Sequence, residues 1–174
     1  MLLPINNTCY STVNGPGYRF VLWVQGCKLN CKGCFNPETH SYLSATSKNI
    51  ESIASEINSN NLIDGVTISG GEPLDYAIEL IELMKMINPS LTSVIFTGYT
   101  IKEIVKDINK VKLIKNVDMV LAGRYKNKFE HPYLGKKLLN ITGRIDSSYF
   151  LPKTKIEYSI NLSKVTKTGI FKTQ

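Results

Sequence analysis

Long hydrophobic runs are missing from this chain of 174 residues. No apolar stretch approaches the ~20 residues that a membrane-spanning helix needs. The first residues, Met1 to Asn6, lack the basic segment and long apolar core of a secretory signal peptide. The sequence also contains no internal repeat or low-complexity tract. We therefore expect a cytoplasmic protein with reduced thiols, a single domain over residues 1–174 and no membrane partner.

Cysteine is scarce and confined to the N-terminal part of the chain, since none of the four cysteines follows position 34. A disulfide scaffold would spread an even number of cysteines through a short secreted chain. Here Cys27, Cys31 and Cys34 lie within eight residues, and Cys9 stands apart. This distribution argues against a disulfide framework and favours a thiolate metal site.

Acidic residues are also few, with 14 Asp and Glu against 21 Lys and Arg, for a formal charge of +7. The lysines are dispersed over the second half of the chain, which is typical of a solvated surface. An acidic partner protein is the alternative. A nucleic-acid partner is disfavoured, because neither an aromatic RNA-binding motif nor a helix-turn-helix pattern accompanies the charge.

What the sequence does contain is an alternation of buried strands and amphipathic helices, which predicts an α/β fold with parallel strands. A closed eight-stranded barrel of ~250 residues is too large for this chain. We therefore expect an incomplete, open (βα)5-6 partial TIM-type barrel, with a short antiparallel C-terminal edge around residues 155–160. The expected strands cover residues 18–25, 65–69, 93–97 and 117–121, and the expected helices cover residues 50–57, 77–84 and 101–108.

Three conspicuous segments follow the ends of expected strands. They are the cysteine loop after residue 25, the Gly70-Gly71-Glu72-Pro73 turn, and the Thr97-Gly98-Tyr99 segment. Parallel strands in α/β folds present ligands at their carboxyl ends. We therefore expect the three segments to converge on one rim.

The cysteine spacing, C-x3-C-x2-C, supplies three soft ligands and leaves a metal centre one ligand short. A structural zinc site would need a fourth ligand, which Cys9 or His40 could supply. A redox dithiol of Cys31 and Cys34 would leave Cys27 unexplained. An iron–sulfur cluster with one open iron accounts for all three thiolates.

The Gly-Gly-Glu-Pro turn also allows two interpretations. It can be a tight strand-to-helix turn, with Pro73 at a first helical position. Alternatively, Gly70 and Gly71 let the backbone approach a ligand closely, while Glu72 faces a cationic group. The cysteine cluster about 40 residues earlier favours the second interpretation.

Taken together, these motifs resemble the radical S-adenosylmethionine (SAM) superfamily. Within it they resemble the activating enzymes that install a glycyl radical, in particular the anaerobic ribonucleoside-triphosphate reductase-activating branch. The resemblance extends over roughly two thirds of the chain. The matching segments are residues 15–19, 24–27, 31–40, 66–74 and 96–99.

The resemblance implies a [4Fe–4S] cluster with one iron held by each of Cys27, Cys31 and Cys34. SAM would chelate the fourth iron through its amino and carboxylate groups. Gly33 would offer its backbone to the adenine, and Phe35 belongs to the same expected cofactor-binding set. No catalytic residue is expected beyond the cluster.

At the end of the expected strand over residues 65–69, the resemblance implies that Gly70, Gly71 and Glu72 bind the methionyl ammonium of SAM. Thr97 would lie near the sugar or the sulfonium. One electron from the cluster would then cleave SAM to a 5′-deoxyadenosyl radical, which takes hydrogen from the substrate.

The implied protein substrate is a glycine of a glycyl-radical enzyme, and the implied electron donor is a flavodoxin or ferredoxin. Two departures favour a different peptide or small-molecule substrate. Ala122 stands where the activases carry an aspartate, and in the segment of residues 139–144 only Arg144 is recognisable. The third hypothesis is a non-enzymatic iron–sulfur or zinc-binding module, but it does not account for the Gly-Gly-Glu-Pro turn.

Overall fold

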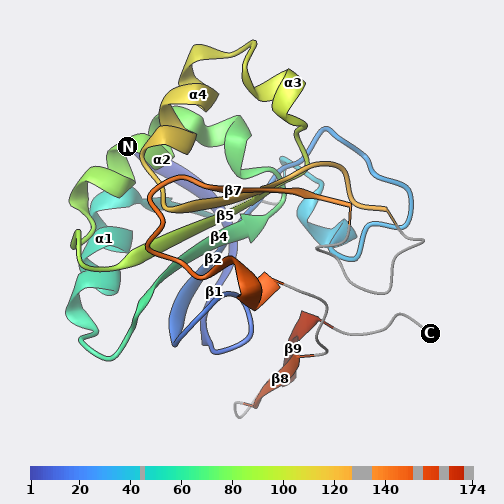
Figure 1. The fold of residues 1–174 in the computed structure, drawn as a ribbon. Helices are drawn as coiled ribbons and strands as arrows, with labels where there is room; N and C mark the ends of the chain where they lie inside the picture. The colour runs from blue at the N-terminus through green and yellow to red at the C-terminus, as the bar shows by residue number, and fades with distance from the viewer. Residues whose placement is uncertain (44–45, 127–134, 151–154, 161–164, 171–174) are drawn as a thin grey trace.

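A seven-stranded mixed sheet forms the centre of the molecule (Figure 1). The computed structural model describes residues 1–43, 46–126, 135–150, 155–160 and 165–170, with side chains described as far as residue 150. The strand order is β3-β1-β2-β4-β5-β6-β7. The strands are β1 (Leu2–Ser11), β2 (Arg19–Val24), β3 (Thr46–Asn49), β4 (Gly65–Gly70), β5 (Thr92–Thr97), β6 (Met119–Ala122) and β7 (Lys137–Asn140).

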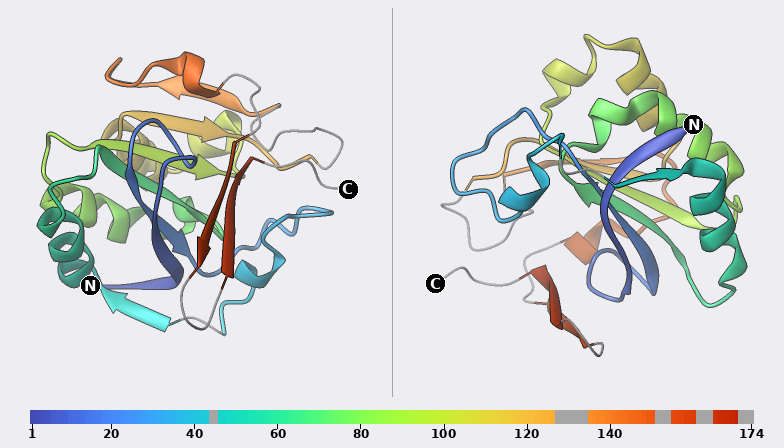
Figure 2. Two further views of the ribbon diagram at one scale, coloured as in Figure 1. Left: turned by 90° about the horizontal axis from the view of Figure 1, so that it is seen from below. Right: turned by 180° about the vertical axis from the view of Figure 1, so that it is seen from behind.

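Helices connect the central strands and pack on one face of the sheet, as the view from behind also shows (Figure 2). Three short 3-10 helices lie in the connections. The helices are α1 (Ile50–Ser59), α2 (Ala77–Met86), α3 (Ile101–Ile104) and α4 (Ile108–Lys115), and the 3-10 helices are η1 (Pro37–Thr39), η2 (Pro73–Tyr76) and η3 (Ser147–Phe150).

The four central strands β2, β4, β5 and β6 are parallel, which confirms the expected α/β class. Their carboxyl ends meet at one edge, where Val24 pairs with Gly70 and Thr97 pairs with Ala122. The described sheet has fewer parallel strands than the five or six βα units that we expected. The reason is that β1, β3 and β7 join it in antiparallel orientation.

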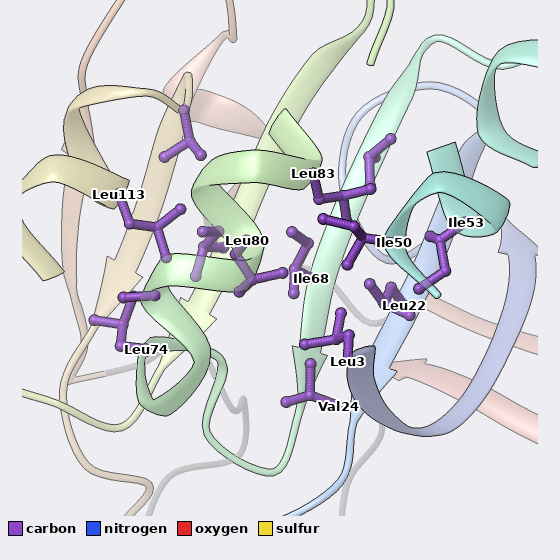
Figure 3. Close-up of a cluster of buried hydrophobic side chains, with 14 of the residues drawn as sticks. Leu3, Leu22, Val24, Ile50, Ile53, Ile68, Leu74, Leu80, Leu83 and Leu113 are labelled. Carbon is purple, nitrogen blue, oxygen red and sulfur yellow. The ribbon is translucent and has the colours of Figure 1, made fainter. Parts of the chain in front are cut away.

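The alternation of side chains along the strands builds a core on each face of the sheet. Ile95 and Val120 face the helices, and their neighbours Val94 and Met119 belong to a smaller cluster on the other face. Figure 3 shows the larger cluster, in which side chains of the strands interdigitate with those of the helices. Phe150, on η3, contributes to the smaller cluster.

Two local expectations were wrong. The helix expected over residues 101–108 is broken into α3 and α4, because the Asp107 side chain accepts hydrogen bonds from Asn109 N and Lys110 N and begins a second helix. The antiparallel edge of the main sheet is β7. The segment expected there forms β8 (Lys155–Ile160), which pairs with β9 (Val165–Ile170) in a separate two-stranded sheet.

Within the described ranges, none of the helices has the length and apolar character needed to cross a lipid bilayer.

Candidate functional site

The cysteine loop begins at the carboxyl end of β2 and is held at its base by a returning segment of chain. Gly26 N donates to Thr39 O at 2.8 Å, and Cys27 N donates to His40 O at 3.1 Å. The loop therefore closes on itself within about fifteen residues. Of the two candidate fourth ligands, His40 lies at this base, and Cys9 lies on β1 opposite Val21 of β2.

The Gln25 side chain also stabilises the base of the cysteine loop through hydrogen bonds. Its amide nitrogen donates to Glu38 O at 3.0 Å and to Ser41 O at 2.7 Å, and its amide oxygen accepts from the Asn6 side chain at 2.9 Å. The Tyr76 hydroxyl donates to Gln25 O at 2.5 Å. Backbone positions on both sides of the three cysteines are thus fixed by the fold.

The three predicted cluster ligands lie on this loop and are half-buried, and no disulfide involves any of the four cysteines. Cys34 N donates to Cys31 O at 3.1 Å, which turns the chain between the second and third thiols. Burial raises the pKa of the Cys27 and Cys34 thiols above the usual range. Across the described residues, no three His, Cys, Asp or Glu side chains converge on a point where one metal ion would sit.

The Gly-Gly-Glu-Pro turn packs directly against the start of the cysteine loop. Gly71 N donates to Val24 O at 2.8 Å, and Glu72 N donates to Gly26 O at 2.9 Å. A Cβ atom on Gly71 would come within 2.2 Å of Gly26 O, so only glycine permits this approach of the two backbones. The two sequence motifs are therefore joined through main-chain atoms, as their placement at one rim predicted.

Glu72 is fully buried beneath that turn. Its carboxylate accepts hydrogen bonds from Leu74 N at 2.9 Å, Thr97 Oγ1 at 2.6 Å and Gly98 N at 2.8 Å. Burial raises the pKa of Glu72 to about 7, against the opposing effect of these donors. Glu72 thus ties the ends of β4 and β5 together. A carboxylate has about four acceptor sites, and these donors occupy three of them.

Asp75, on η2, is a site residue that the sequence analysis missed. Its carboxylate accepts from the Tyr99 hydroxyl at 2.6 Å and from the Tyr42 hydroxyl at 2.9 Å, and Lys28 Nζ lies 3.4 Å away. These partners come from the cysteine loop, the segment after η1 and the end of β5. Asp75 therefore links three parts of the rim. No periodicity or motif marks it in the sequence.

A second missed residue is Lys136, which lies directly before β7. Its ammonium donates to Thr97 O at 3.0 Å and to Gly123 O at 2.5 Å. Burial lowers the pKa of Lys136 to about 8, although Glu72 and Cys31 act in the opposite direction. A lysine 39 positions after Thr97 carries no sequence signal that would bring the two together.

The remaining predicted cofactor contacts frame the cysteine loop. Phe35 is exposed, and its ring packs against Tyr125 with 5.3 Å between centroids. Gly33 has a φ of +69°, which lets the chain turn sharply before Cys34. Contact of Gly33, Phe35, Gly70, Gly71, Glu72 and Thr97 with SAM stays a prediction.

Gly15, Gly17 and Arg144, which were compared with the family above, lie at the opposite, amino end of the parallel strands. Gly15 and Gly17 precede β2. Asp118, before β6, accepts hydrogen bonds from Ser93 N and Thr142 Oγ1, and it pairs with Arg144 at 3.3 Å. Arg144 therefore fastens the base of the sheet and is distant from the cysteine rim.

The donor set of the site fits an iron–sulfur cluster. Soft thiolates are the ligands that such clusters take, and these three lie half-exposed on a loop whose base is fixed. Beside them stand a buried carboxylate and a lysine ammonium.

Comparison with known proteins places this site in a family. A family model described as a 4Fe-4S single cluster domain matches residues 13–140. The anaerobic ribonucleoside-triphosphate reductase-activating protein of Enterobacteria phage T4 is 33% identical over 121 residues, which cover 65% of this chain and 74% of that protein. The chain therefore belongs to the 4Fe-4S single cluster domain family. The predictions of a radical SAM protein and of an enzyme of the glycyl-radical-activating type are confirmed by these matches.

A pyruvate formate-lyase-activating enzyme of Listeria monocytogenes serovar 1/2a is 42% identical over 82 residues. That match covers 42% of this chain and 33% of the Listeria enzyme. Among solved structures, QueE from Escherichia coli matches with a TM-score of 0.49 and 20% identity, over 57% of this chain and 54% of that chain.

Proposed function

We propose that this protein reductively cleaves SAM at a [4Fe–4S] cluster held by Cys27, Cys31 and Cys34. The radical so produced takes a hydrogen atom from a glycine of a partner glycyl-radical enzyme of the anaerobic ribonucleotide reductase type. In this proposal residues 1–174 are one radical SAM domain that works in the cytoplasm, and a flavodoxin or ferredoxin supplies the electron.

The observation that carries the proposal is the pair of hydrogen bonds between the two motifs. Gly71 and Glu72 donate from their backbones to Val24 O and Gly26 O, at the first turn of the cysteine loop. Two segments about 40 residues apart are thus held in contact, and the contact leaves no room for a side chain at Gly71. A plain strand-to-helix turn would not require that approach.

The chain's own residues would orient the bound group and limit its contact with water. When bound, the cluster supplies the electron that breaks a carbon–sulfur bond of SAM. The remaining acceptor site of Glu72 suits the ligand ammonium. Phe35 and Tyr125 form an aromatic pair over the loop, which can shield the adenine side of the site from solvent.

The first test is cluster assembly, using Cys27→Ala with Cys9→Ala as the matched control. After anaerobic reconstitution, we expect four irons per chain in the wild type and in Cys9→Ala. We expect fewer than four in Cys27→Ala, because one iron loses its protein ligand. SAM cleavage, measured as 5′-deoxyadenosine and methionine, should follow the cluster and fall at least about 100-fold in Cys27→Ala. A full four-iron cluster in Cys27→Ala would show that the ligand assignment is wrong.

The partner is tested by electron paramagnetic resonance with a co-expressed glycyl-radical enzyme. A glycyl radical doublet on the partner is the expected result. The alternative is a different peptide or small-molecule substrate, which Ala122 and the engagement of Arg144 with Asp118 favour. SAM cleavage without a doublet on any glycyl-radical partner would support that alternative.

A further inference from the structure

Lys136 is fixed at the carboxyl ends of β5 and β6 by the backbone. Its ammonium donates to Thr97 O and Gly123 O. Thr97 O also accepts from Gly123 N at 3.2 Å, so the two strand ends and the lysine form one hydrogen-bonded unit. The position of the charge is therefore set by main-chain atoms rather than by a mobile side-chain partner.

This unit lies beside the cysteine loop, as contacts on both sides of it show. A Cβ atom on Gly98 would come within 2.4 Å of the Leu29 side chain, which is on the loop. The ring of Tyr125 packs on Phe35, directly after the last cysteine. Lys136 is hydrogen-bonded to Thr97, directly before Gly98, and to Gly123, two residues before Tyr125. Its charge interacts with the thiols of Cys31 and Cys34.

Within the part of the chain that the structure describes, Lys136 has no ion-pair partner. Arg124, the nearby arginine, forms a bidentate pair with Glu103 at 2.6 and 3.0 Å, and Lys28 pairs with Asp75. Among the described residues, no carboxylate lies within ion-pair distance of the Lys136 ammonium, and the third of its protons has no acceptor. Glu72 acts on it only at longer range.

We propose that Lys136 is a fixed counter-cation of the cluster, which raises the reduction potential of that cluster by stabilising its reduced form. The inference rests on the proposed function, because it requires the [4Fe–4S] cluster on Cys27, Cys31 and Cys34. Reduction transfers one electron from the reductant to the cluster, so the net charge of the cluster becomes more negative by one. A positive charge held in a partly buried site stabilises that added charge. With its pKa near 8, Lys136 remains mainly protonated at pH 7.

The test is a redox titration of the anaerobically reconstituted full chain, with dithionite as the reductant. The signal of the reduced cluster is read by electron paramagnetic resonance. Lys136→Met removes the charge and the hydrogen bonds, whereas Lys136→Gln removes the charge but keeps donor protons. Lys136→Arg keeps the charge. Lys112→Met, on the exposed surface of α4, is the control for loss of a distant lysine.

In both neutral variants we expect the ratio of reduced to oxidised cluster at a fixed potential to fall about tenfold, a shift of about 59 mV for one electron. Lys136→Arg and Lys112→Met should stay within about threefold of the wild type. Should Lys136→Met fail to fold, Lys136→Gln carries the test alone.

A four-iron Lys136→Gln variant that titrates like the wild type would overturn the inference, because charge would then play no part. Failure of the wild type itself to assemble four irons would overturn the proposed function, and this inference with it. Iron counting, done before each titration, tells the two failures apart.

Discussion

Arg19, at the amino end of β2, is completely buried without a carboxylate partner among the described residues. All five of its guanidinium N–H groups are used by neutral oxygens. The acceptors are Thr67 Oγ1, Pro16 O, Thr92 Oγ1, Val66 O and Thr92 O, at 2.7 to 3.0 Å. Burial lowers the pKa of Arg19 to about 10, which still leaves it charged at neutral pH. One side chain thus joins β2, β4 and β5 at the end of the sheet opposite the cysteines.

Replacing Arg19 by methionine should destabilise the protein by about 3 kcal/mol, because several buried oxygens lose their donors at once. Arg19→Lys should recover only part of that loss, since an ammonium has three donors and lacks the planar fork. Urea unfolding measures both. Lys102→Met, which removes an exposed cation, should change the free energy of unfolding by less than about 0.5 kcal/mol. A loss below about 1 kcal/mol for Arg19→Met would mean that the buried hydrogen bonds contribute little.

At the residue scale, the sequence can indicate a candidate site where its members lie close together in the chain. Cys27, Cys31 and Cys34 share one loop, so their spacing alone indicates a common site. Asp75 and Lys136 escaped notice because their partners come from distant segments. Their proximity is produced by the pairing of β4, β5 and β6, and no residue-level pattern encodes it.

At the scale of elements, α3 is stabilised by contacts at its own beginning. Thr100 N and Thr100 Oγ1 both donate to Glu103 Oε2, at 2.8 and 2.7 Å. Arg124, after β6, forms an ion pair with the same carboxylate and also donates a hydrogen bond to Gly98 O. The backbone hydrogen bond from Thr100, followed by the bond from Arg124, lowers the pKa of Glu103 to about 2. A single carboxylate thus connects a four-residue helix to the end of the sheet.

Because the pKa of Glu103 is lower in the folded state than its ordinary value of about 4.5, the ionised form stabilises the fold. That stabilisation should be complete above pH 4.5 and should be lost as the pH falls towards 2. Thermal unfolding of wild type and Glu103→Gln should therefore differ at pH 7 and converge between pH 4.5 and pH 2.

The matched control is Glu79→Gln on α2, which removes a carboxylate without these partners. A constant difference between wild type and Glu103→Gln across the acid range would show that the effect is steric.

The central strands could be predicted to within about two residues at each end, whereas the antiparallel edge strands and the break between α3 and α4 could not. The alternation of apolar runs located β2, β4, β5 and β6, because buried parallel strands are apolar throughout. The same pattern did not predict β1 and β7, because their composition is mixed. These strands are held in the sheet by pairing with β2 and β6. The pattern also merged α3 with α4, since Val105 and Ile108 fit a helical period but are exposed, at 63% and 66%.

Across the whole molecule, the excess of positive charge gathers in part on α3 and α4. Ile108, Lys112 and Lys115 recur at spacings of four and three, which places them on one face of α4. Lys102 and Lys106 lie exposed on and after α3. A basic face of this kind suits the approach of an acidic protein and raises the rate of encounter.

If a flavodoxin or ferredoxin uses this face, its reduction of the cluster should slow about tenfold when salt is raised from 50 to 500 mM, because the charges are then screened. Stopped-flow absorbance of the cluster measures the rate. Photoreduction by a neutral deazaflavin should be insensitive to salt and serves as the control. A protein-donor rate that ignores ionic strength would exclude electrostatic steering at this surface.

The contact between Gly71 and Gly26 O has a consequence for how the rim can evolve. Because the contact is made from main-chain atoms, substitutions of Lys28 or Lys32 leave it untouched, and the loop can change its outward chemistry at little structural cost. Any side chain at position 71 would separate β4 from the loop. Substitutions on the outer face of the loop can therefore alter what docks on this rim, while the main-chain contact keeps the two motifs in the same relative position.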